Sequence, residues 1–121
     1  MIDHLTLKVR DIRRARAFYT AALAPLGYEI LMEFEGGLGM GADKKPDLWL
    51  AQDPDDVRPV HLAFTAPSRT AVREFHAAAL RAGAKDNGGP GIREHYHPTY
   101  YAAFVLDENG HNLEAVVHRP E

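Results

Sequence analysis

Two histidines and one glutamate are the residues of this chain whose types and positions point most directly to chemistry. His4 and His61 each begin a short alternating apolar segment, and Glu114 lies within a third such segment near the C-terminal end. Alternation places each polar side chain on the strand face opposite its apolar neighbours. Two imidazoles and a carboxylate that converge from three strands suit a divalent cation with positions left open for substrate. We therefore predict a metal site of His4, His61 and Glu114 for Fe²⁺, Mn²⁺, Ni²⁺, Co²⁺ or Zn²⁺, among which the sequence does not choose.

The metal interpretation depends on an internal repeat. Taken alone, a histidine at the start of a strand is more often a surface residue than a ligand, and a glutamate in a last strand is usually solvated. His4 and His61 are separated by 57 residues (61 − 4), and the same offset aligns Phe18 with Phe75 without a gap. Chance does not readily place two histidines at matching positions of two copies. The sequence therefore predicts a single domain, 1–121, with a pseudo-repeat of residues 1–57 and 58–121 whose histidines face one cleft.

The elements that must position these residues follow from periodicity and turn signals. Asp11 and Ser68 are expected to cap two helices, because short polar side chains favour that place. The expected elements are a strand over 2–9, a helix over 12–24, three short strands within 28–52, a strand over 59–66, a helix over 69–82, one irregular strand within 84–99, and strands over 100–106 and 112–118. The faces expected to pack on the helices are Leu5, Leu7 and Val9, Leu62 and Phe64, and Leu113, Ala115 and Val117. The predicted fold class is α+β, with two βαβββ modules whose helices lie outside the strands.

Composition excludes several classes of function. The chain has 121 residues, a net charge of −3 and no cysteine, so disulfide frameworks, thiol catalysis and zinc–thiolate sites are excluded. No run of lysine or arginine suggests nucleic acid, and no apolar stretch approaches the length of a membrane span. The start of the chain lacks a signal-peptide pattern. We expect a cytoplasmic protein that binds neither nucleic acid nor membrane.

Three segments resemble a known family. HLTLKV with FYTAAL, PVHLAF with FHAAAL, and YYAAFVLDENGHNLEAV are similar to the vicinal oxygen chelate superfamily, which includes glyoxalase I, extradiol dioxygenases, fosfomycin-resistance enzymes and bleomycin-binding proteins. The run from Asp107 to Glu114 is the most specific part, because it fits the family's acidic turn, glycine and metal-ligand glutamate. The resemblance covers essentially the whole chain. It implies paired half-barrels, metal ligands at His4, His61 and Glu114, and a homodimer.

The last strand of the first half departs from glyoxalase I, which has a fourth protein ligand there. Aligning Leu48 with Leu113 puts Trp49 opposite Glu114, and tryptophan cannot ligate a metal. The remaining set of two histidines and one glutamate is similar to extradiol dioxygenases and fosfomycin-resistance enzymes. Residues 91–100 contain no lysine and no serine, which argues against a phosphonate ligand.

The remaining site predictions concern side chains around the metal. Glu114, Tyr100 and His97 are predicted to be catalytic. Residues 91–100 are also consistent with a surface loop whose histidines are solvated, and His111 is interpreted as structural. The predicted substrate contacts are Thr6, Phe34, Trp49, Arg93, His95 and Phe104.

The function that follows is a glyoxalase-like metalloenzyme of lyase, isomerase or dioxygenase type. It would act on a small oxygenated organic molecule that chelates the metal through two oxygens, and the metal would serve as a Lewis acid. The alternative is a non-enzymatic protein that binds a small molecule or antibiotic, as bleomycin-resistance proteins do. A third interpretation is extradiol cleavage of a catechol, which requires Fe²⁺.

Overall fold

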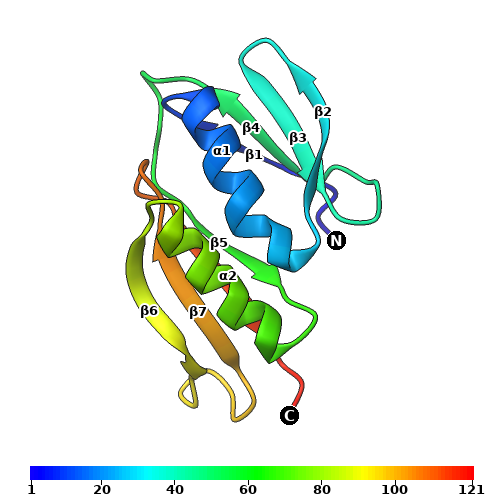
Figure 1. Ribbon diagram of the computed structural model, residues 1–121, viewed down its shortest axis with the longest axis vertical. Coiled ribbons are helices and arrows are strands. Elements are labelled where there is room, and N and C mark those ends of the chain that lie inside the picture. The colour runs from blue at the N-terminus through cyan, green and yellow to red at the C-terminus, as the bar shows by residue number, and fades with distance from the viewer.

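A computed structural model describes residues 1–121 as two βαβββ modules that follow one another along the chain (Figure 1). A single 3₁₀ turn, Ala24–Leu26, follows the first helix. Module 1 contains β1 (Leu5–Val9), α1 (Ile12–Leu23), β2 (Glu29–Phe34), β3 (Gly37–Gly41) and β4 (Leu48–Gln52). Module 2 contains β5 (His61–Thr65), α2 (Arg69–Arg81), β6 (Lys85–Ile92), β7 (Tyr101–Leu106) and β8 (Asn112–Val117).

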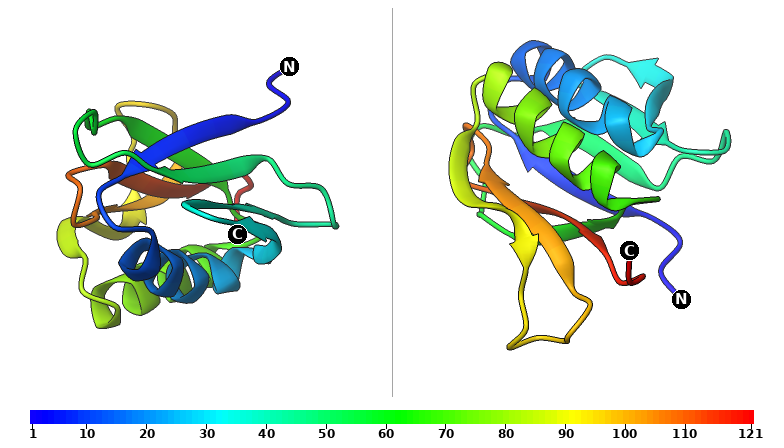
Figure 2. Two further views of the ribbon diagram at one scale, coloured as in Figure 1. Left: turned by 90° about the horizontal axis from the view of Figure 1, so that it is seen from above. Right: turned by 60° about the horizontal axis from the view of Figure 1, so that its bottom comes forward.

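Each module forms its own four-stranded mixed sheet with the same topology. The strand orders are β1-β4-β3-β2 and β5-β8-β7-β6, with β1–β4 and β5–β8 parallel and the other pairs antiparallel. Both helices lie on one side of the two sheets and contact each other (Figure 2). The opposite face of each sheet, called here the open face, carries no helix. The predicted α+β fold of paired βαβββ modules is confirmed.

Strand register relates the two modules residue by residue. In module 1, Thr6 of β1 lies opposite Trp49 of β4. In module 2, Ala63 of β5 lies opposite Glu114 of β8. Thr6 and Ala63 are separated by the 57 residues of the repeat (63 − 6), so Trp49 stands in module 1 where Glu114 stands in module 2. The predicted equivalence of these two positions is therefore met in the register.

The helices begin where the sequence predicts. The Asp11 carboxylate accepts hydrogen bonds from the backbone N–H groups of Arg13 and Arg14, and the Ser68 hydroxyl accepts one from Ala71. These caps satisfy donors that a helix start leaves unpaired. The helices and strands are one to three residues shorter than expected. None of the helices is long and apolar enough to cross a membrane.

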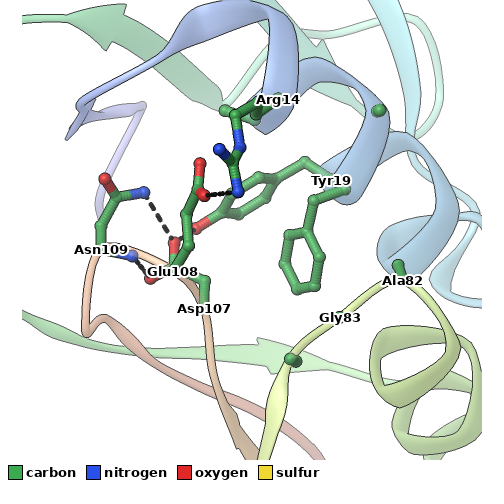
Figure 3. Close-up of a pocket in the computed structure, with 11 residues that line it drawn as sticks. Arg14, Tyr19, Ala82, Gly83, Asp107, Glu108 and Asn109 are labelled. Carbon is green, nitrogen blue, oxygen red and sulfur yellow. Dashed lines mark hydrogen bonds and ion pairs between the residues drawn. The ribbon is translucent and has the colours of Figure 1, made fainter.

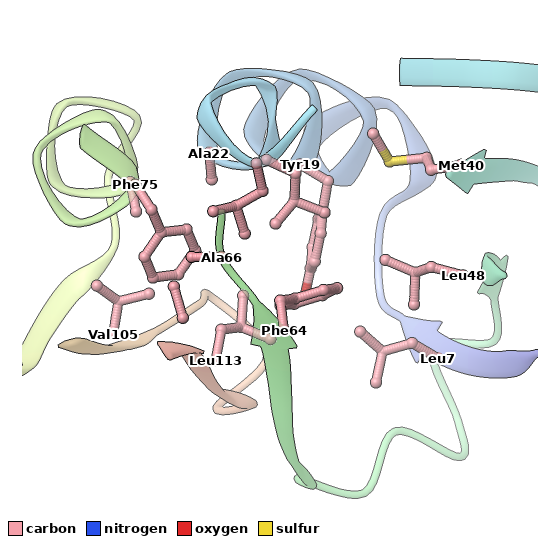
Figure 4. Packing of buried hydrophobic residues seen from close by; sticks show 14 of the residues in the cluster. Leu7, Tyr19, Ala22, Met40, Leu48, Phe64, Ala66, Phe75, Val105 and Leu113 are labelled. Atoms are coloured by element: carbon pink, nitrogen blue, oxygen red, sulfur yellow. The ribbon is translucent and has the colours of Figure 1, made fainter. Parts of the chain in front are cut away.

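One continuous apolar core lies between the helices and the sheets of both modules (Figure 4). Tyr19 of α1 and Phe75 of α2 are among its largest fully buried side chains. The strand residues expected to face the helices belong to this core or pack against it, except for Leu5. Leu5 is 38% exposed, because it begins edge strand β1 beyond the cover of the helices. The strand residues in the core are Leu7, Val9, Leu38, Met40, Leu48, Leu50, Phe64, Ala103, Val105, Leu113, Ala115 and Val117.

The β7–β8 turn joins module 2 to module 1. The buried Asp107 carboxylate accepts a 2.6 Å hydrogen bond from the Tyr19 hydroxyl of α1. The Asn109 side chain accepts one from the Arg10 backbone. The buried His111 ring contacts the Lys8 carbonyl oxygen through Nε2 at 2.8 Å. The prediction that His111 is structural is consistent with these contacts, which hold β1 and α1 against module 2.

Candidate functional site

Glu114 is the centre of a polar group on the open face of module 2. It lies in mid-strand on β8 and is only 1% exposed, yet no lysine or arginine pairs with it. Its Oε1 lies 2.7 Å from Nε2 of His61, the first residue of β5. Its Oε2 accepts a short hydrogen bond from the Tyr100 hydroxyl, which comes from the residue before β7. Three of the predicted site residues are thus in direct contact.

Tyr100 acts as a donor in this group. Partial burial and the neighbouring Glu114 carboxylate raise the pKa of Tyr100 to about 12, because both disfavour a phenolate beside a negative charge. The phenol therefore stays protonated near neutral pH and donates to the carboxylate. The arrangement can hold a proton at the Tyr100 oxygen and present a carboxylate to a ligand on the open face.

Aromatic and cationic groups surround this carboxylate. Phe104 of β7 lies opposite Glu114 in register, and its ring centroid is 6.1 Å from that of His61. The Arg93 guanidinium lies over the Phe104 ring at 5.2 Å. Arg93 also donates to the carbonyl oxygens of Gly89 and Gly91, which fixes its position. The predicted contact Phe104 is therefore beside Glu114, and the predicted contact Arg93 lies next to Phe104.

The loop from Arg93 to Tyr100 places the two remaining predicted histidines farther out. His95 packs on the Tyr96 ring at a centroid distance of 4.1 Å, and Tyr96 packs edge-on against Tyr100 at 5.0 Å. Nδ1 of His97 accepts from the Thr99 backbone N–H at 3.2 Å. Both histidines are exposed, and neither contacts Glu114.

Sequence reasoning missed His118 as a member of this group. Its ring packs edge-on against Tyr100 at a centroid distance of 5.0 Å. The signal was available, because residues 114, 116 and 118 alternate along one strand direction and share a face.

The other predicted contacts lie on the open face of module 1. His4, Thr6, Phe34 and Trp49 line one hollow of about 300 Å³. Phe34 is 54% exposed, and its ring centroid lies 6.3 Å from that of Trp49. This hollow contains no residue of the Glu114 group.

One chain does not bring the three predicted metal ligands together. Nδ1 of His4 lies 2.7 Å from an oxygen of its exposed neighbour Asp3, while His61 and Glu114 contact each other on the other module. No three histidine, aspartate, glutamate or cysteine residues form a group that could hold a metal ion. The residues of one chain therefore do not fit a three-ligand metal site, and the expected convergence in a single cleft of the chain is not met.

A hollow of about 450 Å³ lies between the two modules beside His61. Lys8 lines it, with its Nζ 2.5 Å from Asp56 and 3.3 Å from Asp53. These carboxylates raise the pKa of Lys8, and Lys8 in turn lowers the pKa of Asp56. The hollow is lined by residues of both modules, including Val60 and His111.

A further hollow of about 370 Å³ lies on the helix side, between α1, the α2–β6 turn and the β7–β8 turn (Figure 3). Arg14 and Glu108 form a 2.9 Å ion pair at this hollow, and Asp107 bonds Tyr19 and Asn109. Its charged groups therefore satisfy one another. None of the predicted site residues lines this hollow, and only its shape would suggest a binding site.

Comparison with known proteins identifies the family. Residues 1–115 match the model of the Glyoxalase/Bleomycin resistance protein/Dioxygenase superfamily. No curated protein matches the chain.

Solved structures share the fold. A glyoxalase/bleomycin resistance protein from Albidiferax ferrireducens T118 superposes with a TM-score of 0.83 at 22% identity, covering 94% of this chain and 96% of that one. A glyoxalase/bleomycin resistance protein/dioxygenase family enzyme from Burkholderia phytofirmans PsJN gives 0.76 at 18% identity, covering 98% of each chain. A glyoxalase-related enzyme from Fulvimarina pelagi gives 0.70 at 16% identity, covering 96% and 86%. The chain belongs to the Glyoxalase/Bleomycin resistance protein/Dioxygenase superfamily.

Proposed function

We propose that this protein is an enzyme that acts on a small oxygenated organic molecule at the open face of module 2. The single observation that carries the proposal is the Glu114 carboxylate, which is 1% exposed and held only by His61 and Tyr100. A buried carboxylate without a lysine or arginine partner is costly, and such groups are typical of functional sites. The proposal covers the lyase, isomerase and dioxygenase classes of the superfamily together and does not choose one of them.

We further propose that His61 and Glu114 hold a divalent cation, with His4 supplied by a second copy of the chain. The isolated chain leaves His4 on the open face of module 1, and the edge strands β1 and β5 are each paired on one side only. A two-fold dimer that places the open face of module 1 against that of module 2 would form two equal composite sites. The donor set of two imidazoles and a carboxylate then fits the cation.

A bound divalent cation would supply Lewis-acid stabilisation of negative charge on a substrate oxygen. The chain's own residues would do the rest. Tyr100 is protonated and positioned to donate to a substrate oxygen once Glu114 releases it. Arg93, held over Phe104, would orient an anionic or carbonyl oxygen at the edge of the site.

Calorimetric titration with Mn²⁺, Co²⁺, Ni²⁺ and Zn²⁺ tests the cation. His61→Ala should weaken binding by more than about tenfold, because a three-ligand site has little redundancy. His76→Ala is the matched control, since Nε2 of His76 also contacts a carboxylate, that of Asp86, at 3.0 Å. Equal weakening in the two variants, or none in either, would remove His61 from the site.

The second candidate is a non-enzymatic protein that binds a small molecule. The specific observation that favours it is that Glu114 already has a partner for each oxygen within one chain, while His4 is remote. This candidate predicts no cation binding by the wild-type protein and ligand binding that is unchanged by a chelator. The same calorimetric series therefore separates the two functions.

A further inference from the structure

The open face of module 1 carries two aromatic rings that lie on glycines. Gly37 and Gly39 of β3 point to this face, whereas Leu38 and Met40 between them point into the core. A Cβ atom on Gly37 would lie 2.5 Å from the Phe34 ring. A Cβ atom on Gly39 would lie 2.6 Å from the Trp49 ring. Real side chains do not approach this closely, so both rings need glycine beneath them.

The strand register explains this arrangement. Phe34 is the hairpin partner of Gly37 across β2–β3, and Trp49 is the partner of Gly39 across β3–β4. Each ring lies across its partner's backbone instead of standing away from the sheet. The glycines are buried by the rings, while Phe34 remains 54% exposed. We call the pair Phe34 and Trp49 the aromatic platform.

The upper surface of the platform faces a hollow. The two ring planes are tilted by 43° with centroids 6.3 Å apart, and the hollow above them has a volume of about 300 Å³. Its other lining side chains include His4 and Thr6, and no carboxylate, lysine or arginine lines it. A planar ring that enters can stack on one platform ring and meet the edge of the other, which are the two geometries aromatic pairs prefer.

Covering strand glycines with aromatic rings also stabilises a sheet. That role needs only coverage, and an aliphatic side chain of similar size would serve it. It does not account for a large apolar ring left half in water beside a histidine and a threonine, in a hollow that no carboxylate, lysine or arginine lines. The combination of fixed rings, open space and two polar side chains is that of a ligand site.

We propose that the aromatic platform selects substrates that carry a planar aromatic ring. This inference deepens the proposed function and rests on it for the identity of the ligand as a substrate, since His4 of the same hollow is the ligand proposed to join His61 and Glu114 of a second copy. The ring would lie on Phe34 and Trp49 while the oxygen substituents point toward His4.

The test compares mandelate with hexahydromandelate, which carry the same vicinal oxygens and differ in the aromaticity of the ring. Binding is followed by quenching of the fluorescence of Trp49, the only tryptophan in the chain. Mandelate should bind more tightly, by about threefold to tenfold, in the presence of chelator and also with Mn²⁺ added. Equal affinity for the two acids overturns the inference, as does the absence of quenching by mandelate.

Phe34→Leu keeps an apolar side chain on Gly37 and removes one of the two platform rings, so the preference for mandelate should become smaller while the fold persists. Met32→Leu is the matched control, because Met32 lies on the same strand, is also 54% exposed and does not line the hollow. Unchanged preference in Phe34→Leu contradicts the inference. Failure of the proposed function would give a different result. The preference for mandelate over hexahydromandelate would remain, but added Mn²⁺ would not increase the affinity for either acid.

Discussion

Glu114 and Asp107 are the two carboxylates that the fold buries, and they are held in different ways. Asp107 accepts hydrogen bonds from two backbone N–H groups, from the Tyr19 hydroxyl and from the Asn109 amide. These donors are fixed by a turn and a helix, so Asp107 is part of the framework. Glu114 has only the side chains of His61 and Tyr100, both of which can turn away. The Glu114 carboxylate is therefore the one available to a ligand.

The framework role of Asp107 gives a prediction for Tyr19→Phe. Loss of the hydroxyl should lower the free energy of unfolding near neutral pH by about 1–3 kcal/mol, because a buried carboxylate loses one donor. Burial and Asp107 raise the pKa of Tyr19 well above its usual 10. In the unfolded chain the phenol ionises near pH 10, so the stability it contributes is full below that pH and is lost as the pH rises above it.

Urea denaturation across a series of pH values measures this directly. The stability difference between the wild type and Tyr19→Phe should shrink above pH 10 by up to about 1.4 kcal/mol per pH unit. A difference that stays constant between neutral pH and pH 11 would mean that Tyr19 ionises in the folded and unfolded states alike.

At the scale of elements, β3 has one face of large core side chains and one face of glycines. Leu38 and Met40 are core residues, while Gly37 and Gly39 are covered by aromatic rings. The same strand therefore fixes the core of module 1 and the position of the aromatic platform. Glycine in a strand usually weakens it, and here it makes room for a neighbouring ring.

Gly39→Ala should therefore lower the free energy of unfolding by about 1–3 kcal/mol, because its methyl group would overlap the Trp49 ring. Displacement of the ring into water should also shift the Trp49 emission to longer wavelength. Gly89→Ala on β6 is the control, since no atom lies within 4 Å of the added carbon. It should change stability by less than about 0.5 kcal/mol. Similar stability loss in the two variants would contradict the packing account of β3.

The elements were largely predictable from the sequence, whereas the position of His4 was not. Alternation and capping residues indicate strand faces and helix starts, and the alignment of Leu48 with Leu113 predicts that Trp49 and Glu114 are equivalent. These are local properties. Alternation shows that His4 and Glu114 lie on open faces, but it does not show whether the two faces meet within one chain. That depends on how α1 and α2 pack and on the contacts of the β7–β8 turn, which are long-range.

For the whole molecule, the β7–β8 turn sets the relative position of the modules. His111 bonds on both sides of its ring: Nδ1 accepts from the Val60 backbone N–H at 3.2 Å, and Nε2 contacts the Lys8 carbonyl oxygen at 2.8 Å. One acceptor and one donor nitrogen correspond to a single neutral tautomer. His111 is 1% exposed, so these two bonds are shielded from water in the folded protein.

His111→Ala should lower the free energy of unfolding by about 2–4 kcal/mol, because two backbone groups lose partners and a cavity remains. His118→Ala is the comparison, since that exposed ring makes only an aromatic contact. Its effect should stay below about 1 kcal/mol. Chemical denaturation measures both, and comparable losses for the two histidines would remove the special role of the turn.

A composite site between two copies is the central claim at this scale, and mixing two defective variants tests it most directly. His4→Ala and Glu114→Gln should each lose tight cation binding, as each lacks one ligand in every site. After the two are unfolded together and refolded, about half the dimers are mixed, and each mixed dimer has one site with all three ligands. Calorimetry with Mn²⁺ should then recover about a quarter of the wild-type sites at wild-type affinity. No recovery from a mixture that has refolded and exchanged subunits would contradict a site shared between copies.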